Sequence, residues 1–171
     1  MVDISLLEQV VIRHVTHEDL PALEWEGEYR HFRRLFADAF RRSQRGESVL
    51  WIAELPGRGI IGQVFIQLDG IQSSLADGQE RAYIYGFRVR PEFRGEGVGS
   101  LLLATAETDL RRRGFVKVAL NVGRDNPAAR RLYERFGYGV VAAEPGVWSY
   151  LDEQGRLRQV NEPAWRMEKQ I

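Results

Sequence analysis

A strand, a glycine-rich loop and an apolar helix follow one another in the middle of the chain, and this succession constrains the fold most. The loop RGEGVG, residues 94–99, lies directly before the helix. Glycines let a ligand approach the backbone closely, and the first turn of a helix offers N–H groups without intrahelical partners. The loop is therefore either a tight turn or a site for a phosphate-containing ligand. The preceding strand, AYIYGFRV, alternates, which predicts that one face carries Tyr83, Tyr85, Phe87 and Val89.

The other predicted elements place this unit inside one α/β domain. Their order is strand, two helices, three strands, helix, strand, helix and two strands, which indicates one mixed sheet covered on both faces. The length suits a single domain of residues 1–171. Strands are predicted at 10–15, 49–55, 60–68, 82–89, 115–122, 139–143 and 164–169, helices at 16–23, within 29–47, at 98–113 and within 126–138, a polar connection at 69–80, and an irregular insert between the last two strands.

The composition limits the chemistry. The chain has 24 basic and 24 acidic side chains, three histidines and no cysteine. The lack of thiols excludes disulfides, thiolate metal sites and an acyl-cysteine intermediate, and the histidines have no spacing that suggests a metal site. The charge balance argues against nucleic acid or a membrane surface as partner. With no signal peptide or membrane span in the sequence, we expect a cytoplasmic protein and leave open a homodimer.

Two familiar phosphate loops do not fit the glycine-rich stretch. The Walker loop requires a lysine followed by serine or threonine after its last glycine, whereas Gly99 is followed by Ser100 and Leu101. The dinucleotide-binding fingerprint requires a glycine or alanine where Ser100 stands. The sequence also lacks the G-x-S-x-G elbow of serine hydrolases. Neither a nucleotide site of these types nor a serine nucleophile is therefore indicated.

Two motifs together resemble those of the GCN5-related N-acetyltransferase (GNAT) superfamily. Residues 94–99 resemble its acyl-CoA-binding motif, Arg/Gln-x-x-Gly-x-Gly/Ala, and follow a strand as that motif does. The resemblance implies a single mixed, mostly antiparallel sheet with helices on both faces. It also implies direct transfer of an acetyl group from acetyl-CoA to an amine of a small molecule or peptide, without a metal. The second motif is represented by Asn126, Ala129, Leu132, Tyr133, Glu134 and Gly137.

The same resemblance implies roles for individual residues. Tyr133 would protonate the departing thiolate, although its place on an apolar helical stripe also suits core packing. Asn126 would touch the coenzyme or simply cap its helix. Backbone groups of Phe87, Arg88 and Val89 would pair with the pantetheine arm and face the thioester oxygen. Backbone N–H groups would hold the pyrophosphate at Arg94, Gly95, Glu96, Gly97, Val98, Gly99 and Ser100.

The general base is left open by the sequence. Asn121 stands where protein-modifying members of the superfamily often have a carboxylate, and an amide cannot act as a base. The alternatives are Tyr83 or Tyr85, a water chain, or a carboxylate of the segment LEWEGEYRHF, namely Glu24, Glu26 or Glu28. A protein that keeps the pocket only to sense acyl-CoA is the competing interpretation, and the missing carboxylate is its only support.

Overall fold

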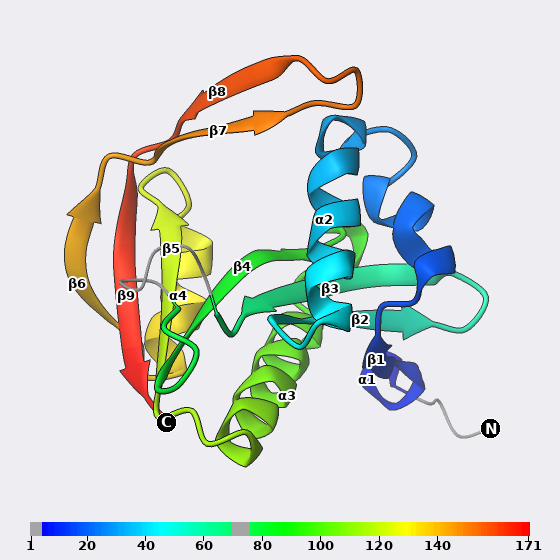
Figure 1. The fold of residues 1–171 in the computed structure, drawn as a ribbon. Coiled ribbons are helices and arrows are strands. Elements are labelled where there is room, and N and C mark those ends of the chain that lie inside the picture. The colour runs from blue at the N-terminus through cyan, green and yellow to red at the C-terminus, as the bar shows by residue number, and fades with distance from the viewer. Residues whose placement is uncertain (1–4, 70–75) are drawn as a thin grey trace.

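The computed structural model describes residues 5–69 and 76–171. Its centre is a seven-stranded sheet in the order β1-β2-β3-β4-β5-β9-β6 (Figure 1). Residues 70–75 of the expected polar connection lie outside the described part of the chain. The strands of this sheet are β1 (Val11–His14), β2 (Ser48–Leu55), β3 (Gly59–Gln67), β4 (Arg81–Val89), β5 (Lys117–Gly123), β6 (Gly139–Glu144) and β9 (Ala164–Gln170).

The sheet is mixed and mostly antiparallel, as predicted. Strands β4 and β5 run parallel, whereas every other neighbouring pair in this sheet is antiparallel. The parallel pair is joined by α3 (Val98–Arg112), because parallel neighbours need a crossover connection. The strand–loop–helix unit of the sequence therefore occupies the middle of the sheet.

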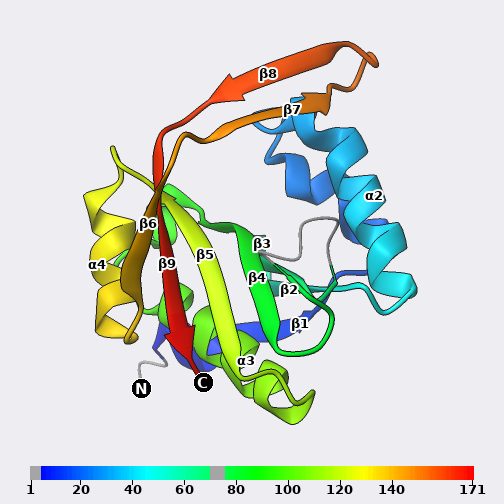
Figure 2. The same ribbon diagram turned by 60° about the vertical axis from the view of Figure 1, so that its left-hand side comes forward.

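Helices cover both faces of the sheet, which Figure 2 shows from the side. On one face lie α2 (Arg33–Gln44) and the 3-10 helices η1 (His17–Glu24) and η2 (Arg30–Phe32). Phe36 and Ala39 of α2 pack there against Phe65. On the other face lie α3 and α4 (Pro127–Arg135), over the larger core. We call these the α2 face and the α3–α4 face.

Local sequence signals set the ends of the two helices on the α3–α4 face. Asn126 caps α4, because its Oδ1 accepts a hydrogen bond from the N–H of Ala129 at 3.2 Å. Pro127 follows at the first helical position, where its missing N–H costs nothing. Gly97 precedes α3 with φ of 90°, a left-handed conformation that side chains disfavour. The capping role predicted for Asn126 is thus confirmed.

Two further elements were not predicted, and one prediction was wrong. A short helix, α1 (Leu6–Gln9), precedes β1, and η3 (Pro91–Phe93) precedes the glycine loop. The insert between β6 and β9 is not irregular: it forms a hairpin of β7 (Val147–Leu151) and β8 (Leu157–Asn161). The hairpin has no apolar alternation facing a core, and Leu157 is 72% exposed, so periodicity could not reveal it. No helix in the described residues is long and apolar enough to cross a membrane.

A buried carboxylate connects α3 to the far side of the sheet. The side chain of Glu107 is only 4% exposed. Its two oxygens accept hydrogen bonds from the Tyr138 hydroxyl at 2.8 Å and from Lys169 Nζ at 2.7 Å. A buried charge is tolerable only when it is paired and hydrogen-bonded in this way. Glu107 therefore holds α3, β9 and the segment after α4 in register.

We predict that Glu107→Ala lowers the free energy of unfolding by about 3 kcal/mol, because it leaves Lys169 and the Tyr138 hydroxyl buried without their partner. Urea unfolding of both proteins measures this difference. The control is Glu134→Ala, which removes an exposed pair with Arg130 on α4. That substitution should cost less than about 1 kcal/mol. Equal losses for the two variants would contradict the role given to Glu107.

Candidate functional site

The two parallel strands separate at their carboxyl ends and leave a fork in the sheet. Pairing between β4 and β5 runs from Arg81–Lys117 to Ile84–Leu120 and ends there. Beyond this point β4 continues along β3, and β5 continues along β9. Backbone groups on the facing edges of the fork have lost their neighbouring strand, so a ligand can pair with them. Openings at the carboxyl ends of parallel strands are where α/β folds bind ligands.

A β-bulge at the fork changes the direction of the side chains of β4. Between the pairs Tyr85–Phe65 and Arg88–Gln63, the two residues Gly86 and Phe87 stand opposite the single residue Val64. Gly86 has φ of 58°, and a Cβ there would lie 3.1 Å from Cδ2 of Phe65, so glycine fits this position. The fully buried Gln63 donates from Nε2 to the carbonyl oxygen of Gly86 at 3.0 Å and thereby satisfies the displaced backbone.

The bulge makes the predicted face assignment of this strand wrong. Strict alternation would put Tyr83, Tyr85, Phe87 and Val89 on one face. Instead, Tyr85 packs on the α2 face, whereas Phe87 and Val89 pack in the α3–α4 core. Arg88 correspondingly points to the α2 face, against Tyr29. One extra residue in the strand thus divides its carboxyl end between the two faces.

The glycine loop presents open N–H groups at the end of the fork. The first bond within α3 runs from the N–H of Leu101 to the carbonyl of Gly97. Within the described ranges, the N–H groups of residues 95–100 donate to no backbone carbonyl. Arg94 is tied back to β4, because its Nε donates to the Val89 carbonyl at 2.8 Å. The loop combines unpaired donors with the positive end of the α3 dipole, which suits an anion.

Tyr133 lies on the α3–α4 face beside the bulge. Its ring is buried, with its centroid 6.0 Å from that of Phe87 and 5.9 Å from that of Tyr138. Burial raises the pKa of Tyr133 above its ordinary value, and the nearby Tyr83 adds to the effect. In the described part of the protein its hydroxyl has no hydrogen-bond partner. The phenol is therefore protonated at neutral pH and available to a ligand.

Polar side chains line the fork on the α2 face. Asn121 Nδ2 lies 3.5 Å from the hydroxyl of Tyr83, which stacks on Tyr85 at 6.1 Å between ring centroids. Burial raises the pKa of both Tyr83 and Tyr85, so neither phenol ionises readily. Arg166 of β9 pairs with Asn121 across the strands and binds Glu144 at 3.1 Å. This ion pair was not among the predicted site residues, because only strand pairing brings β9 beside β5.

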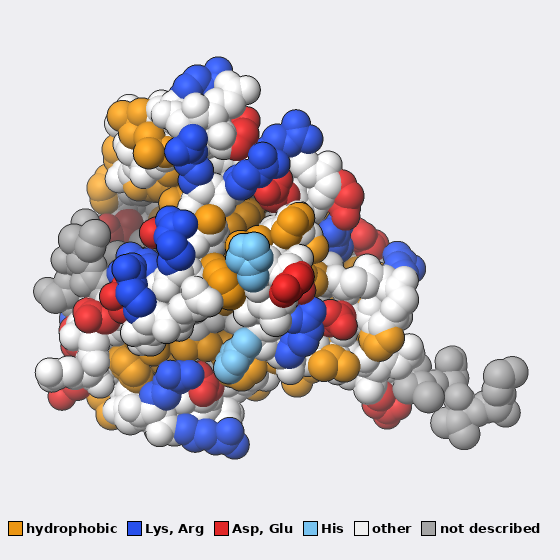
Figure 3. Space-filling view, turned by 45° about the vertical axis from the view of Figure 1, so that its right-hand side comes forward, with side chains coloured by type: hydrophobic (Ala, Val, Ile, Leu, Met, Phe, Trp, Pro, Cys, Tyr) orange, Lys and Arg blue, Asp and Glu red, His pale blue; other side chains and the backbone are white. Residues whose placement is uncertain are grey.

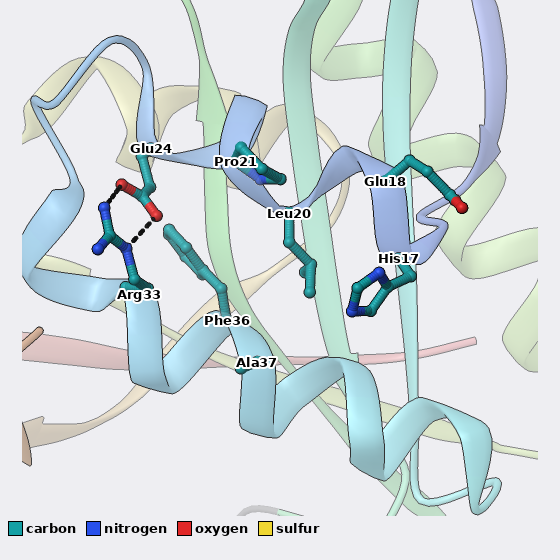
Figure 4. A pocket seen from close by; sticks show the side chains of 8 residues that line it. All are labelled: His17, Glu18, Leu20, Pro21, Glu24, Arg33, Phe36 and Ala37. Atoms are coloured by element: carbon teal, nitrogen blue, oxygen red, sulfur yellow. Dashed lines mark hydrogen bonds and ion pairs between the residues drawn. The ribbon is translucent and has the colours of Figure 1, made fainter.

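The three glutamates of the η1–α2 connection lie apart from one another. Glu24 accepts two hydrogen bonds from Arg33, at 2.8 and 2.9 Å, in a depression between η1 and α2 (Figure 4). Glu26 is held by Arg90 at 2.9 and 3.0 Å, and these bonds lower its pKa. Glu28 is exposed. Two of the three candidate bases are thus paired with an arginine, and the lowered pKa of Glu26 makes that carboxylate a weaker base.

The β7–β8 hairpin reaches across the fork to the α2 face, an arch visible in Figures 1 and 2. It contacts η2 through aromatic rings, with 5.1 Å between the centroids of Tyr150 and Phe32 and 6.2 Å between those of Trp148 and Phe32. Figure 3 shows the side that carries η1 and α2, where hydrophobic side chains surface among interspersed charges of both signs. The hairpin thus borders the fork opposite the glycine loop.

Comparison with known proteins assigns the family. The model of the acetyltransferase (GNAT) family matches residues 13–138, which include the fork, the glycine loop and α4. The chain belongs to the GNAT acetyltransferase family. Its fold is also that of solved structures with low sequence identity. Ard1 from Thermoplasma volcanium has a TM-score of 0.73 and 20% identity, covering 95% of this chain and 98% of that one.

Two further solved structures share this fold. The ribosomal-protein-S18-alanine N-acetyltransferase from Escherichia coli has a TM-score of 0.70 and 21% identity, and the alignment covers 95% of this chain and 94% of that one. PaiA N-acetyltransferase from Thermoplasma acidophilum, solved in complex with coenzyme A, has a TM-score of 0.70 and 19% identity, with 95% and 99% covered. These likenesses show the fold, and the family match identifies the chain as an acetyltransferase with acetyl-CoA as co-substrate.

Acetyl-CoA fits the fork without a metal ligand set. In residues 5–69 and 76–171, no three histidine, aspartate or glutamate side chains gather in a way that could hold a metal ion. The loop N–H groups suit the pyrophosphate, and the open edges of β4 and β5 suit an extended pantetheine arm. Gly99 lies at the start of α3 and packs closely there: a Cβ at this position would lie 3.5 Å from Cζ of Phe87 and 3.6 Å from Cδ2 of Leu132.

We predict that Gly99→Val weakens acetyl-CoA binding at least about tenfold, or about 1.4 kcal/mol, because its methyl groups would press on Phe87, Leu132 and Val89 and shift the backbone of β4 and of the glycine loop. The control is Gly99→Ala, whose single methyl meets its neighbours at ordinary contact distance. Calorimetric titration with acetyl-CoA, together with melting temperatures, compares the two variants. Wild-type affinity in a folded Gly99→Val protein would contradict the placement of the coenzyme.

Proposed function

We propose that this protein is an acetyl-CoA-dependent N-acetyltransferase that moves an acetyl group directly from coenzyme A to a primary amine of a small molecule or peptide. The observation that carries the proposal is the fork between β4 and β5, with an anion-binding loop at one end and a buried phenol beside its bulge. Coenzyme and amine then meet from opposite faces of the sheet.

The coenzyme would lie along the α3–α4 face. The loop from Arg94 to Ser100 binds the pyrophosphate through its N–H groups. The backbone of Phe87 to Val89 pairs with the pantetheine arm, and an N–H at the bulge faces the thioester oxygen. That N–H stabilises the negative charge that develops on the oxygen, which is the largest single requirement of acyl transfer. Asn126 keeps its capping role and approaches the coenzyme from the start of α4.

The chemical step needs one proton donor and one proton acceptor. The amine nitrogen attacks the thioester carbon, the C–S bond breaks, and the thiolate takes a proton from Tyr133. Burial raises the pKa of this phenol, and the same dry surroundings raise the basicity of the thiolate, so the two shifts offset each other. Of Glu24, Glu26 and the amide Asn121, none is a free base. The amine proton would pass to water next to Asn121 and the Tyr83 hydroxyl, or to the exposed carboxylate of Glu28.

The acceptor would enter from the α2 face, below the β7–β8 hairpin. The structure from E. coli is named for an alanine of a ribosomal protein, and another protein of this fold is a chimera of the spermidine N-acetyltransferase from Vibrio cholerae. A primary amine is the group these acceptors share. A screen of amines and peptides with labelled acetyl-CoA tests the proposal directly: transfer to at least one amine class supports it. Coenzyme binding without any transfer would favour a sensor instead.

Tyr133→Phe should lower kcat about 10²-fold, in the usual range for loss of a general acid, because it removes only the proton donor. The Tyr133 hydroxyl has no partner in the described residues, so the melting temperature should hardly change. The measurement is steady-state turnover with an amine found in the screen. Tyr138→Phe is the matched control: it removes a hydroxyl bonded to Glu107, so it should lower the melting temperature and leave kcat nearly unchanged. Wild-type turnover in Tyr133→Phe would exclude the phenol from the mechanism.

Direct transfer also predicts that no acyl-enzyme accumulates. The chain has no cysteine, and no serine elbow offers a nucleophile. Incubation with labelled acetyl-CoA alone, followed by denaturation and mass spectrometry, should show an unmodified chain. Stoichiometric acetylation of one side chain that disappears when an amine is added would overturn direct transfer.

A further inference from the structure

Arg88 is a partly buried cation that has no carboxylate at ion-pair distance among the described residues. Its Nε and Nη2 atoms are inaccessible to water and donate to no described group. These two atoms form the edge of the guanidinium that meets a carboxylate with two parallel bonds. Arg33 uses the same edge in this protein, since its Nε and Nη2 bind the two oxygens of Glu24. A buried charged edge left unpaired is costly, so it calls for an explanation.

Aromatic rings hold the guanidinium in place and leave its edge unpaired. Cζ of Arg88 lies 3.5 Å from the ring centroid of Tyr29, 5.4 Å from that of Trp25 and 5.6 Å from that of Phe36. Stacking of this kind fixes the plane of the group but leaves its Nε and Nη2 without an acceptor. Burial lowers the pKa of Arg88, yet an arginine side chain keeps its charge in proteins. The result is a fixed positive charge inside the α2 face.

The position of Arg88 relates it to the reacting groups. It directly follows Phe87, whose backbone would face the thioester, and the bulge turns the two side chains to opposite faces. Arg88 therefore stands on the side from which the amine would enter. Successive residues of a strand are about 3.3 Å apart, so the backbone of Arg88 lies next to the proposed thioester position, and its side chain extends from there along the α2 face.

Trp25 supplies a second buried donor at the same place. Its side chain is 3% exposed, and its Nε1 has no partner in the described chain. Trp25 and Glu26 have φ of 48° and 55°, and Gly27 follows at 102°, so this turn holds a conformation that side chains disfavour. Strain of this kind persists where a turn is fixed by its surroundings, here by the bonds from Arg90 to Glu26.

We propose that Arg88, assisted by Trp25, binds a carboxylate of the acceptor, so that the substrate is an amine that also carries a carboxylate, such as a free amino acid. The inference rests on the proposed function and names its substrate class. A carboxylate matches the two-donor edge in shape and neutralises the buried charge. The turn from Trp25 to Tyr29 covers the guanidinium, so the proposal requires that the Arg90–Glu26 contact, which fixes this turn, gives way when the acceptor binds.

The test compares pairs of acceptors that differ only in the carboxylate. Glycine, leucine and γ-aminobutyrate are each paired with their amides, which keep the amine and lose the charge. In the wild type kcat/KM should favour the acid of at least one pair at least about tenfold, because a site that hydrogen-bonds a group rejects the analogue without it. The ratio within a pair cancels any general effect on coenzyme binding or turnover. Arg88→Met should bring the ratio close to one.

Two further variants complete the design. Arg88→Lys keeps a charge but not the two-donor edge, so its acid-to-amide ratio should fall between those of the wild type and Arg88→Met. This variant tests the inference even if Arg88→Met fails to fold. Arg113→Met is the control: it removes an arginine paired with Asp109 at the end of α3 and should keep the wild-type ratio. A wild-type ratio near one in every pair, or a preference that survives in Arg88→Met, would overturn the inference. Neither result would count against the proposed N-acetyltransferase function. Preference for phosphoethanolamine over every carboxylate would overturn it as well.

A binding measurement separates this inference from the proposed function. N-acetylglycine, N-acetylleucine and their amides are titrated into the protein with coenzyme A present, and the melting temperature is followed. Stabilisation of the wild type by the acids alone, lost in Arg88→Met, supports the carboxylate site. This holds even if no amine is acetylated, because the absence of acetylation counts against the proposed activity and not against the site. Equal effects of acids and amides would contradict the site.

Discussion

The single extra residue in β4 is the constraint on which the rest of the site depends. Without the bulge, Phe87 would point to the same face as Tyr85, and Arg88 would enter the apolar core around Tyr133. With the bulge, Phe87 faces α3 and α4, and Arg88 faces the α2 side. The fully buried Gln63 stabilises this arrangement, because its side-chain amide donates a hydrogen bond to the Gly86 carbonyl, which the bulge displaces from the strand pairing.

The glycine loop and the capped start of α4 could be predicted from the sequence because their signals are local. Gly97 must adopt a left-handed conformation, and Asn126 caps the helix that it begins. Each signal acts over three or four residues, so it can be read without knowledge of the fold. The same holds for the order of the elements, which follows from hydrophobic periodicity, and for the mixed sheet that this order indicates.

Contacts between distant segments, on either face of the sheet, could not be predicted in this way. Alternation in residues 82–89 continues through the bulge, so nothing in the sequence marks where the faces exchange. Glu107 finds Lys169 across 62 positions, and Arg166 reaches Asn121 only through the pairing of β9 with β5. The β7–β8 hairpin buries little of its apolar surface, which removes the pattern by which strands are recognised. Long-range pairing and weak burial therefore account for the missed features.

The place of β9 in the sheet has a consequence for the order in which the protein folds. This strand, residues 164–170, lies between β5 and β6, both of which are made earlier. During synthesis the first five strands can pair in sequence, while β5 and β6 have no common neighbour until β9 leaves the ribosome. One edge of the fork thus stays incomplete during most of translation, and the nascent chain presents exposed strand edges of the kind that chaperones shield.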